Sequence, residues 1–281
     1  MRFDRRSLFL AAAVSAASGG PAFAAEAKSK AFATLAKGAA PNARNVRGKI
    51  LYIGEDDKER GREWFSFSFR KDGQRTLRAY CEIDDARVER DVVYTMDEKF
   101  RPLDCFVRLT VGGKFLGTGW IRITPTEAEC DVLNVTMGRI HQVVPLTTPA
   151  VSLGAHPLAC DAMALPAFDH SKPEKVQSRS GGLMTSPLLD GASGPMIGMS
   201  QDGSKTEYVG PERIVTPAGT FDAHHYRFPT IEGQAPHPSG NPRSEDIWVT
   251  HPDYIFVRAE VRGYLRNKTG FGRYELVEYE A

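Results

Sequence analysis

An excess of one charge, a long apolar run in the body of the chain and paired cysteine motifs are all missing from this sequence. Lys and Arg total 36 and Asp and Glu total 35, so the formal net charge over 281 residues is +1. Binding to nucleic acid needs a concentrated basic surface, and this balance argues against a nucleic-acid partner. Beyond residue 24 no apolar run reaches the ~20 residues of a membrane-spanning helix. We therefore expect no transmembrane segment in the mature chain.

Common signatures of metal, cofactor and nucleophile sites are also missing. The chain contains no H-x-H or H-E-x-x-H spacing, no paired C-x-x-C, no P-loop and no G-x-G-x-x-G after a strand. Ser193 lies in Gly191-Ala192-Ser193-Gly194, which is not the G-x-S-x-G turn of a hydrolase nucleophile. The sequence therefore predicts neither a bound metal nor a cofactor.

The four cysteines, Cys81, Cys105, Cys130 and Cys160, leave the disulfide state open. In an oxidising compartment this number allows two disulfides. Cys81 and Cys105, however, alternate in step with apolar residues of predicted strands, where a free cysteine packs as a small hydrophobe. Buried free thiols are one interpretation, and a Cys81–Cys105 bridge between strands is the other.

Residues 1–24 have the features of a signal peptide. Arg5 and Arg6 give a positive start, Leu8–Ala17 is an apolar run, and Ala22–Ala24 is an A-x-A cleavage site. The paired arginines resemble a twin-arginine signal, although Asp4 departs from its usual pattern. We expect cleavage at this site and a soluble mature protein in the bacterial periplasm.

Alternation of apolar and polar residues marks strand after strand from about residue 49 onward. In Glu63–Arg70 the three phenylalanines share one face, and Asp72-Gly73 then gives a hairpin turn signal. Only Pro157–Leu165 offers a helical pattern, and it is short. These features predict a mainly β fold. We expect an antiparallel meander that forms a curved sheet or half-barrel from two β-rich halves, with few short helices.

Composition divides the chain into parts. We expect an N-terminal tether at residues 25–45 and a single β-rich domain at residues 46–281. Within that domain, residues 46–144 are predicted to form the first meander and residues 205–281 the second β half. Between them, residues 145–204 are rich in Pro, Gly and Ser, which predicts an irregular crossing segment over the barrel mouth.

Two titratable residues of this crossing segment, His156 and Asp161, flank the short helical candidate. A His–Asp pair can position a catalytic base, but residues five positions apart do not share one face of a helix. Hydrogen bonds within the loop are the simpler interpretation.

The stretch Gly210–Tyr226 reads as strand, tight turn and strand, with Pro217 and Gly219 supplying the turn geometry. It resembles an exported bacterial family, a domain of unknown function, that carries G-x-E-x-[IV]-x-[TV]-P-A-G-T-F, then a W-[VI] strand, then a strand with an Arg. The matching residues are Gly210, Glu212, Ile214, Thr216–Phe221, Trp248-Val249 and Arg258.

Domains of this family look similar to the open half-barrels of periplasmic lipoprotein carriers, which hold acyl chains on a concave apolar face. The resemblance, which covers residues 195–281 best, therefore implies a curved sheet. By analogy of fold alone it also implies an apolar ligand. It implies no catalytic residues.

A cavity lined by strands is the site that these patterns favour. Gly117 and Gly119 leave one face of their strand without side chains, which predicts a bend or room for a ligand. We expect a hydrophobic small molecule or lipid to bind in an apolar cavity with a few polar groups. Its wall would consist of aromatic residues, namely Phe65, Phe67, Phe69, Trp120 and Trp248. The alternative for the three phenylalanines is that they are simply core.

The densest titratable cluster, around His224, His225 and Tyr226, keeps an enzymatic alternative open. One histidine would act as acid or base, and Tyr226 or Arg258 would stabilise developing charge in a cofactor-independent lyase, isomerase or hydrolase. Adjacent strand residues point to opposite faces, so His224 and His225 do not both face one cavity. A structural envelope protein without a small ligand is the third possibility.

Overall fold

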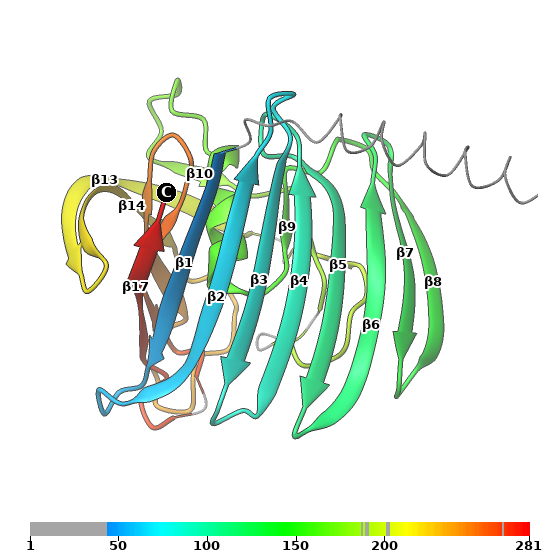
Figure 1. Ribbon diagram of the computed structural model, residues 1–281, viewed down its shortest axis with the longest axis horizontal. Coiled ribbons are helices and arrows are strands. Elements are labelled where there is room, and N and C mark those ends of the chain that lie inside the picture. Colours follow the sequence, from blue (N-terminus) through cyan, green and yellow to red (C-terminus); the bar gives the residue numbers. More distant parts are fainter. Residues whose placement is uncertain (1–43, 187, 189–190, 201–202, 266) are drawn as a thin grey trace, which may run out of the picture. The chain divides into compact units, whose positions relative to one another are not determined.

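A computed structural model gives the structure of this chain and describes residues 44–186, 188, 191–200, 203–265 and 267–281. The predicted signal peptide and nearly all of the predicted tether lie outside those residues. The described residues are mainly strand, as the alternation predicts. Figure 1 shows the strands side by side in one large curved sheet.

One antiparallel sheet of fourteen strands contains both β-rich halves. Its first eight strands follow one another along the chain: β1 (Arg44–Ile53), β2 (Glu59–Phe69), β3 (Arg75–Ile83), β4 (Val88–Met96), β5 (Pro102–Val111), β6 (Lys114–Ile123), β7 (Glu127–Asn134) and β8 (Gly138–Pro145). The other six are β10 (Val176–Ser178), β13 (Lys205–Thr216), β14 (Gly219–Phe228), β15 (Ser244–Thr250), β16 (Phe256–Arg262) and β17 (Gly272–Glu280). Because β17 pairs with β1, the C-terminal half extends the meander beyond its first strand, and β8 and β10 form the two edges.

Period-two alternation explains why these segments form strands with one buried face. On β4, alternate residues from Val88 to Met96 are buried, and those between them are exposed or half-buried. The same alternation turns the side chains of Cys81 and Cys105 inward, where both are buried. All four cysteines are free, so the Cys81–Cys105 bridge considered above does not form.

Two glycines of β6 allow close packing and do not open space for a ligand. A Cβ atom added to Gly119 would lie 2.4 Å from Cγ2 of Val132 on the neighbouring strand β7. A Cβ atom added to Gly117 would lie 2.9 Å from Cδ of Pro195. The prediction of room for a ligand at these glycines is therefore wrong, because the next strand and the crossing segment fill that space.

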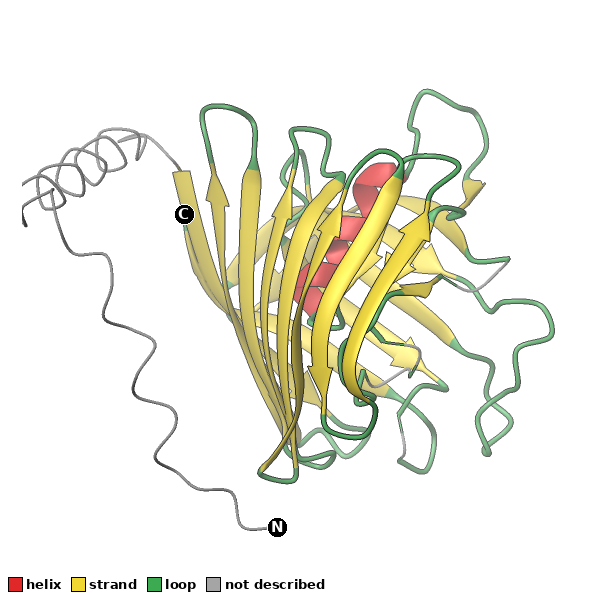
Figure 2. Cartoon of the chain, turned by 90° about the vertical axis from the view of Figure 1, so that its right-hand side faces the viewer, coloured by secondary structure: helices red, strands yellow, loops and turns green. Residues whose placement is uncertain are grey.

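The predicted crossing segment contains short regular elements and packs inside the curve of the sheet. They are β9 (Ser152–Gly154), α2 (Leu158–Asp161), the 3-10 helix η1 (Ala162–Ala167), β11 (Gly182–Met184) and β12 (Gly198–Met199). Leu153, Ala159 and Leu165 are buried in the same hydrophobic cluster as Ile50 and Tyr94 of the large sheet. Figure 2 shows the helices in the hollow that the curved strands form.

The buried carboxylate of Glu63, on β2, fixes the start of α2 to the sheet. It accepts hydrogen bonds from the backbone N–H groups of Leu158 and Ala159, at 2.7 and 3.0 Å, and from the hydroxyl of Tyr52, at 2.6 Å. Pro157 at the N-cap makes no side-chain cap, so Glu63 binds N–H groups that a capping residue normally satisfies.

The helix predicted within Pro157–Leu165 is confirmed. No helix of the described part of the chain is long and apolar enough to cross a membrane.

Candidate ligand-binding cavity

A cavity of about 290 Å³ lies between the large sheet and the crossing segment. Strands of the sheet supply part of its wall, and the rest comes from short elements of the crossing segment, such as β9, α2 and β11, and from loops. Apolar side chains form much of that wall, among them Leu158, Leu183, Phe228, Ile231, Val261 and Leu265. The volume is at the lower end of the range for small-molecule sites.

Ionisable side chains line the same cavity, among them Arg90, His156, Asp161, Arg179 and Glu245. Arg90 points inward from β4, Glu245 lies on β15, and Asp161 ends α2. His156 and Arg179 lie in connecting loops just outside short regular elements. A charge inside a protein is costly unless it is paired, so these residues need a specific explanation.

Arg179 has its guanidinium packed on an aromatic ring. Its Cζ lies 3.9 Å from the ring centroid of Phe228. Nε of Arg179 is buried without a hydrogen-bond partner, and the side chain has no ion pair with any described residue. Burial lowers the pKa of Arg179, and the charge of Glu245 opposes that effect. Since an arginine keeps its proton in proteins, a positive charge faces this cavity.

Two carboxyl groups, Glu245 and Asp161, lie in the same interior. Burial raises the pKa of Glu245 to about 7, against the lowering effect of the charge on Arg179. Burial also raises the pKa of Asp161 well above its usual value, and the charge of Glu245 raises it further. Both groups therefore hold a proton at higher pH than exposed carboxyl groups do. Oε1 of Glu245 is buried and has no hydrogen-bond partner among the described residues.

His156 completes the polar half of the wall beside Arg90. Burial lowers the pKa of His156 to about 3, and the charge of Arg90 lowers it as well, so the imidazole is neutral at neutral pH. Its Nε2 is buried and without a partner in the described part of the chain. A Cβ atom added to Gly191 would lie 2.4 Å from Nη2 of Arg90 and 2.7 Å from the His156 ring. Only glycine allows the chain to pass this close, and its φ of 67° suits glycine too.

The five aromatic residues predicted to line a cavity do not line this one. Phe65 and Phe67 are buried in the main hydrophobic cluster, and Phe69 packs against its margin. Trp120 is 41% exposed on the outer face of β6. Trp248 belongs to a second, small hydrophobic cluster. The structure thus places the three phenylalanines in the core or at its margin and the two tryptophans on or near the outer face. Other residues line the cavity.

The four residues predicted for acid–base chemistry divide between the two faces of the sheet. His224 and Tyr226 share one face of β14, and His225 projects from the other, as the strand alternation requires. Arg258, on β16, bonds to Glu260 at 2.6 Å beside His225's network. The structure therefore does not bring the four into one site.

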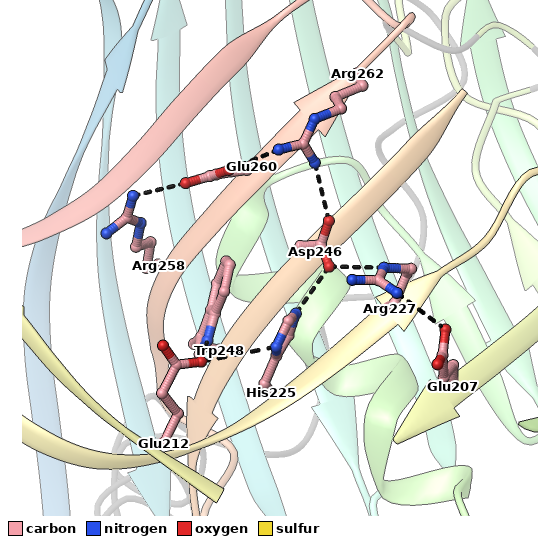
Figure 3. Close-up of polar contacts among 9 residues, drawn as sticks. All are labelled: Glu207, Glu212, His225, Arg227, Asp246, Trp248, Arg258, Glu260 and Arg262. Atoms are coloured by element: carbon pink, nitrogen blue, oxygen red, sulfur yellow. Dashed lines mark hydrogen bonds and ion pairs between the residues drawn. The ribbon is translucent and has the colours of Figure 1, made fainter. Parts of the chain in front are cut away.

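Asp246 is the centre of the network on the outer face (Figure 3). It accepts hydrogen bonds from Nε2 of His225 and Nε of Arg227, both at 2.8 Å, and from Nη1 of Arg262 at 3.0 Å. Burial alone would raise the pKa of Asp246, but the hydrogen bond from His225 and the charge of Arg227 lower it below its usual value. The His225 ring stacks on Trp248 with centroids 4.2 Å apart. These side chains satisfy one another, which favours a structural role.

His224 and Tyr226 belong to a cluster of histidines and tyrosines on the inner face. The Tyr226 hydroxyl lies 2.7 Å from Nε2 of His170 and 2.9 Å from Nε2 of His251. A hydroxyl donates one proton, so at least one of these Nε2 atoms carries a hydrogen and donates it. Nδ1 of His224 lies 2.7 Å from the hydroxyl of Tyr208, and the His224 ring stacks on His251 at 3.6 Å.

One group of described residues has the spacing of metal ligands: Glu129, Asp131 and His141, whose nearest ligand atoms lie within 4.8 Å of one another. The guanidinium of Arg122 already pairs with the Glu129 carboxylate at 2.5 Å, so a metal ion would have to compete with it for that ligand. Exposed acidic groups often gather without binding an ion, so this group carries no metal assignment.

No protein-family model matches the chain, and no curated protein matches it. Solved structures that it resembles include a β-barrel-like protein of the domain of unknown function DUF1849 from Brucella abortus, with 8% identity and a TM-score of 0.48 over 85% of this chain and 97% of that one. A predicted lipoprotein from Parabacteroides distasonis has 12% identity and a TM-score of 0.30, with 85% and 97% covered. A predicted exported protein with a YmcC-like fold from Bacteroides fragilis has 11% identity and a TM-score of 0.31, with 86% and 98% covered.

One of these proteins is thus described as a barrel-like domain of unknown function, one as a lipoprotein and one as exported. At identities of 8–12% and TM-scores below 0.5, these likenesses carry no argument about what this chain does or binds.

Proposed function

We propose that this protein is an exported binding protein that holds a hydrophobic or amphipathic small molecule in the cavity between the sheet and the crossing segment. One observation carries the proposal. Nε of Arg179, Nε2 of His156 and Oε1 of Glu245 are buried without hydrogen-bond partners among the described residues, and all three residues line this cavity. Because buried polar groups are nearly always paired, polar atoms of a small molecule in this cavity are the partners that we propose for these side chains.

The size of the cavity supports a small ligand over a large lipid. A volume of about 290 Å³ corresponds to about ten groups the size of a water molecule. A lipid with two long acyl chains is much larger than this. The apolar part of the wall, such as Phe228 and Val261, would cover the body of the ligand, and the ionisable part would bind its polar group.

The location of this activity rests on the sequence. We infer from the A-x-A cleavage site and the paired arginines that the chain is exported and that its mature form acts in the periplasm.

Native mass spectrometry of the protein purified from its own periplasm tests the proposal. We expect a co-purifying small molecule at one per chain, which denaturing extraction then identifies. Ala86→Trp adds a large ring to the cavity wall and should displace the molecule, whereas Glu89→Trp, at an exposed position, should retain it. A ligand-free mass for the unmodified protein, or equal retention by both variants, would contradict the proposal.

The inner cluster of histidines and tyrosines favours a second candidate, an enzyme that uses His224 as acid or base. Its support is the hydrogen-bonded pair of His224 and Tyr208, which holds the imidazole in one orientation. His224→Gln and His225→Gln should both retain the ligand if the protein only binds it. Under the enzymatic alternative, the substrate binds at this cluster, because His224 does not line the cavity of about 290 Å³, and His224→Gln should stop its turnover while leaving the protein folded.

A further inference from the structure

We propose that the cavity selects a small amphiphile with one anionic head group, and that Arg179 binds that head group. This inference rests on the proposed function, since it names the class of ligand that the same cavity takes. The head group is a carboxylate, or a phosphate or sulfate of the same charge. The apolar body lies against the aliphatic and aromatic part of the wall.

The first argument is that Arg179 differs from other half-buried arginines of this chain. Arg62 has carboxylate partners at 2.7 Å or less, and Arg227 pairs with Asp246 at 2.8 Å. Arg179 has no such partner among the described residues, although it faces an interior cavity. A desolvated guanidinium is stable when an anion pairs with it, and its planar fork matches a carboxylate or phosphate.

The second argument is that the structure holds Arg179 in place for such a role. Its backbone N–H donates to the carbonyl oxygen of Ser204 at 2.9 Å, which anchors the loop after β10. Cζ of the guanidinium then lies 3.9 Å from the ring centroid of Phe228. No described residue forms a hydrogen bond with this guanidinium, so its N–H groups are available to a ligand in the cavity.

The third argument concerns the sign of the charge. Asp161 and Glu245 face the same interior and could instead suggest a cationic ligand. A carboxyl group in a low-dielectric site can take up a proton and become neutral, whereas a guanidinium cannot. Burial raises the pKa of both carboxyl groups, so they are disposed to be protonated and to donate a hydrogen bond to an anion. Arg90, whose guanidinium also reaches this wall, adds positive charge.

The apolar wall and the volume set the body of the ligand. Phe228, Ile231, Val261 and Leu265 line the cavity together with Arg179. A chain of about ten non-hydrogen atoms fills a space of this size. Octanoate has a carboxylate head, a saturated body and ten non-hydrogen atoms in all, and it is therefore the probe of choice.

Isothermal titration of the mature protein with three probes of equal chain length tests the inference: sodium octanoate, octan-1-ol and octylammonium chloride. We expect octanoate to bind at least tenfold more tightly than the neutral or the cationic probe. Arg179→Gln should weaken octanoate at least tenfold and leave octanol unchanged, while Arg179→Lys keeps a charge and should retain part of the preference. Arg139→Gln is the matched control, because Arg139 is exposed on β8 and away from the cavity.

The possible results separate failure of the anionic head group from failure of the proposed binding function. Equal binding of octanoate and octanol, or an unchanged preference in Arg179→Gln, would overturn the anionic head group while the binding function survives. Tighter binding of octylammonium would overturn it in favour of the carboxyl pair. If none of the three probes binds and the purified protein carries no small molecule, both the inference and the proposed function fail. Thermal unfolding of each variant establishes that a loss of binding is not a loss of fold.

Discussion

Oε2 of Glu63 lies 2.7 Å from the backbone nitrogen of Leu158, a residue 95 positions later in the chain. This hydrogen bond joins the large sheet to the crossing segment at the point where α2 begins. Asp161, three residues further on, lines the cavity. The position of one cavity wall therefore depends on a carboxylate of the first meander.

Glu63→Ala should destabilise the protein severely. The change leaves two backbone N–H groups, of Leu158 and Ala159, and the hydroxyl of Tyr52 buried without their acceptor. Each unpaired group costs about 1–3 kcal/mol, so the free energy of unfolding should fall by at least about 3 kcal/mol in urea denaturation. Glu89→Ala, on the exposed face of β4, should change it by less than about 0.5 kcal/mol. Similar losses in the two variants would contradict the role of Glu63.

The stability contributed by Glu63 should depend on pH in an unusual direction. Burial raises the pKa of Glu63 to about 7 in the folded protein, despite hydrogen bonds that lower it. In the unfolded chain the pKa is near 4.5. The folded state therefore binds the proton more tightly, so this contribution is complete below pH 4.5 and is lost as pH rises through about 7. Glu245, with a pKa also near 7, acts in the same direction.

Urea denaturation of the unmodified protein and of Glu63→Gln across this pH window measures the effect. The variant cannot ionise, so its free energy of unfolding should fall less between pH 5 and pH 8, by about 3 kcal/mol if the whole shift is expressed. Glu89→Gln should keep the unmodified pH dependence. If the free energies of unfolding of Glu63→Gln and the unmodified protein differ by the same amount at every pH, the pKa of Glu63 is not raised by folding.

The sheet is predictable from sequence because its signals are local. Alternation in Glu63–Arg70 and turn signals such as Asp72-Gly73 lie within a few residues, and they correctly predict strands β2 and β3 and the hairpin between them. The hairpin at Pro217 and Gly219 is confirmed in the same way, as strands β13 and β14.

The site is less predictable because it depends on contacts between distant parts of the chain. The inward phenylalanines, such as Phe65 and Phe67, are equally compatible with a core and with a ligand wall. In the structure they belong to the same hydrophobic cluster as buried residues of the crossing segment, so they are part of the core. His156 and Asp161 stand out in the sequence as titratable residues around a short helix, and both do line the cavity. Arg179 gives no local signal, since its loop shows only small and polar neighbours.

The four thiols should be unreactive in the folded protein. Cys81, Cys105, Cys130 and Cys160 are all free and at most 1% exposed. Burial raises the pKa of Cys81 to about 11, so very little thiolate is present at neutral pH. We expect a thiol-reactive dye to label none of them in buffer and all four in urea under non-reducing conditions. Rapid labelling in buffer, or fewer than four free thiols after unfolding, would contradict this structure.

Asp246→Asn should weaken the second half of the sheet without touching the cavity, since Asp246 is not among the cavity residues. The change removes the charge that His225, Arg227 and Arg262 share and leaves their donors with a weaker acceptor. Removing one partner of a buried ion pair costs about 3 kcal/mol, and we expect a loss of that size in urea denaturation at pH 7.

The loss in Asp246→Asn should also depend on pH. Since the pKa of Asp246 is lowered by folding, its contribution to stability is present above pH 3.8 and is lost as pH falls further. The free energies of unfolding of the variant and the unmodified protein should therefore converge in acid. Asp222→Asn, at an exposed position of β14, is the control and should lose little. A loss in Asp246→Asn no greater than in the control would mean that solvent screens the network of Figure 3.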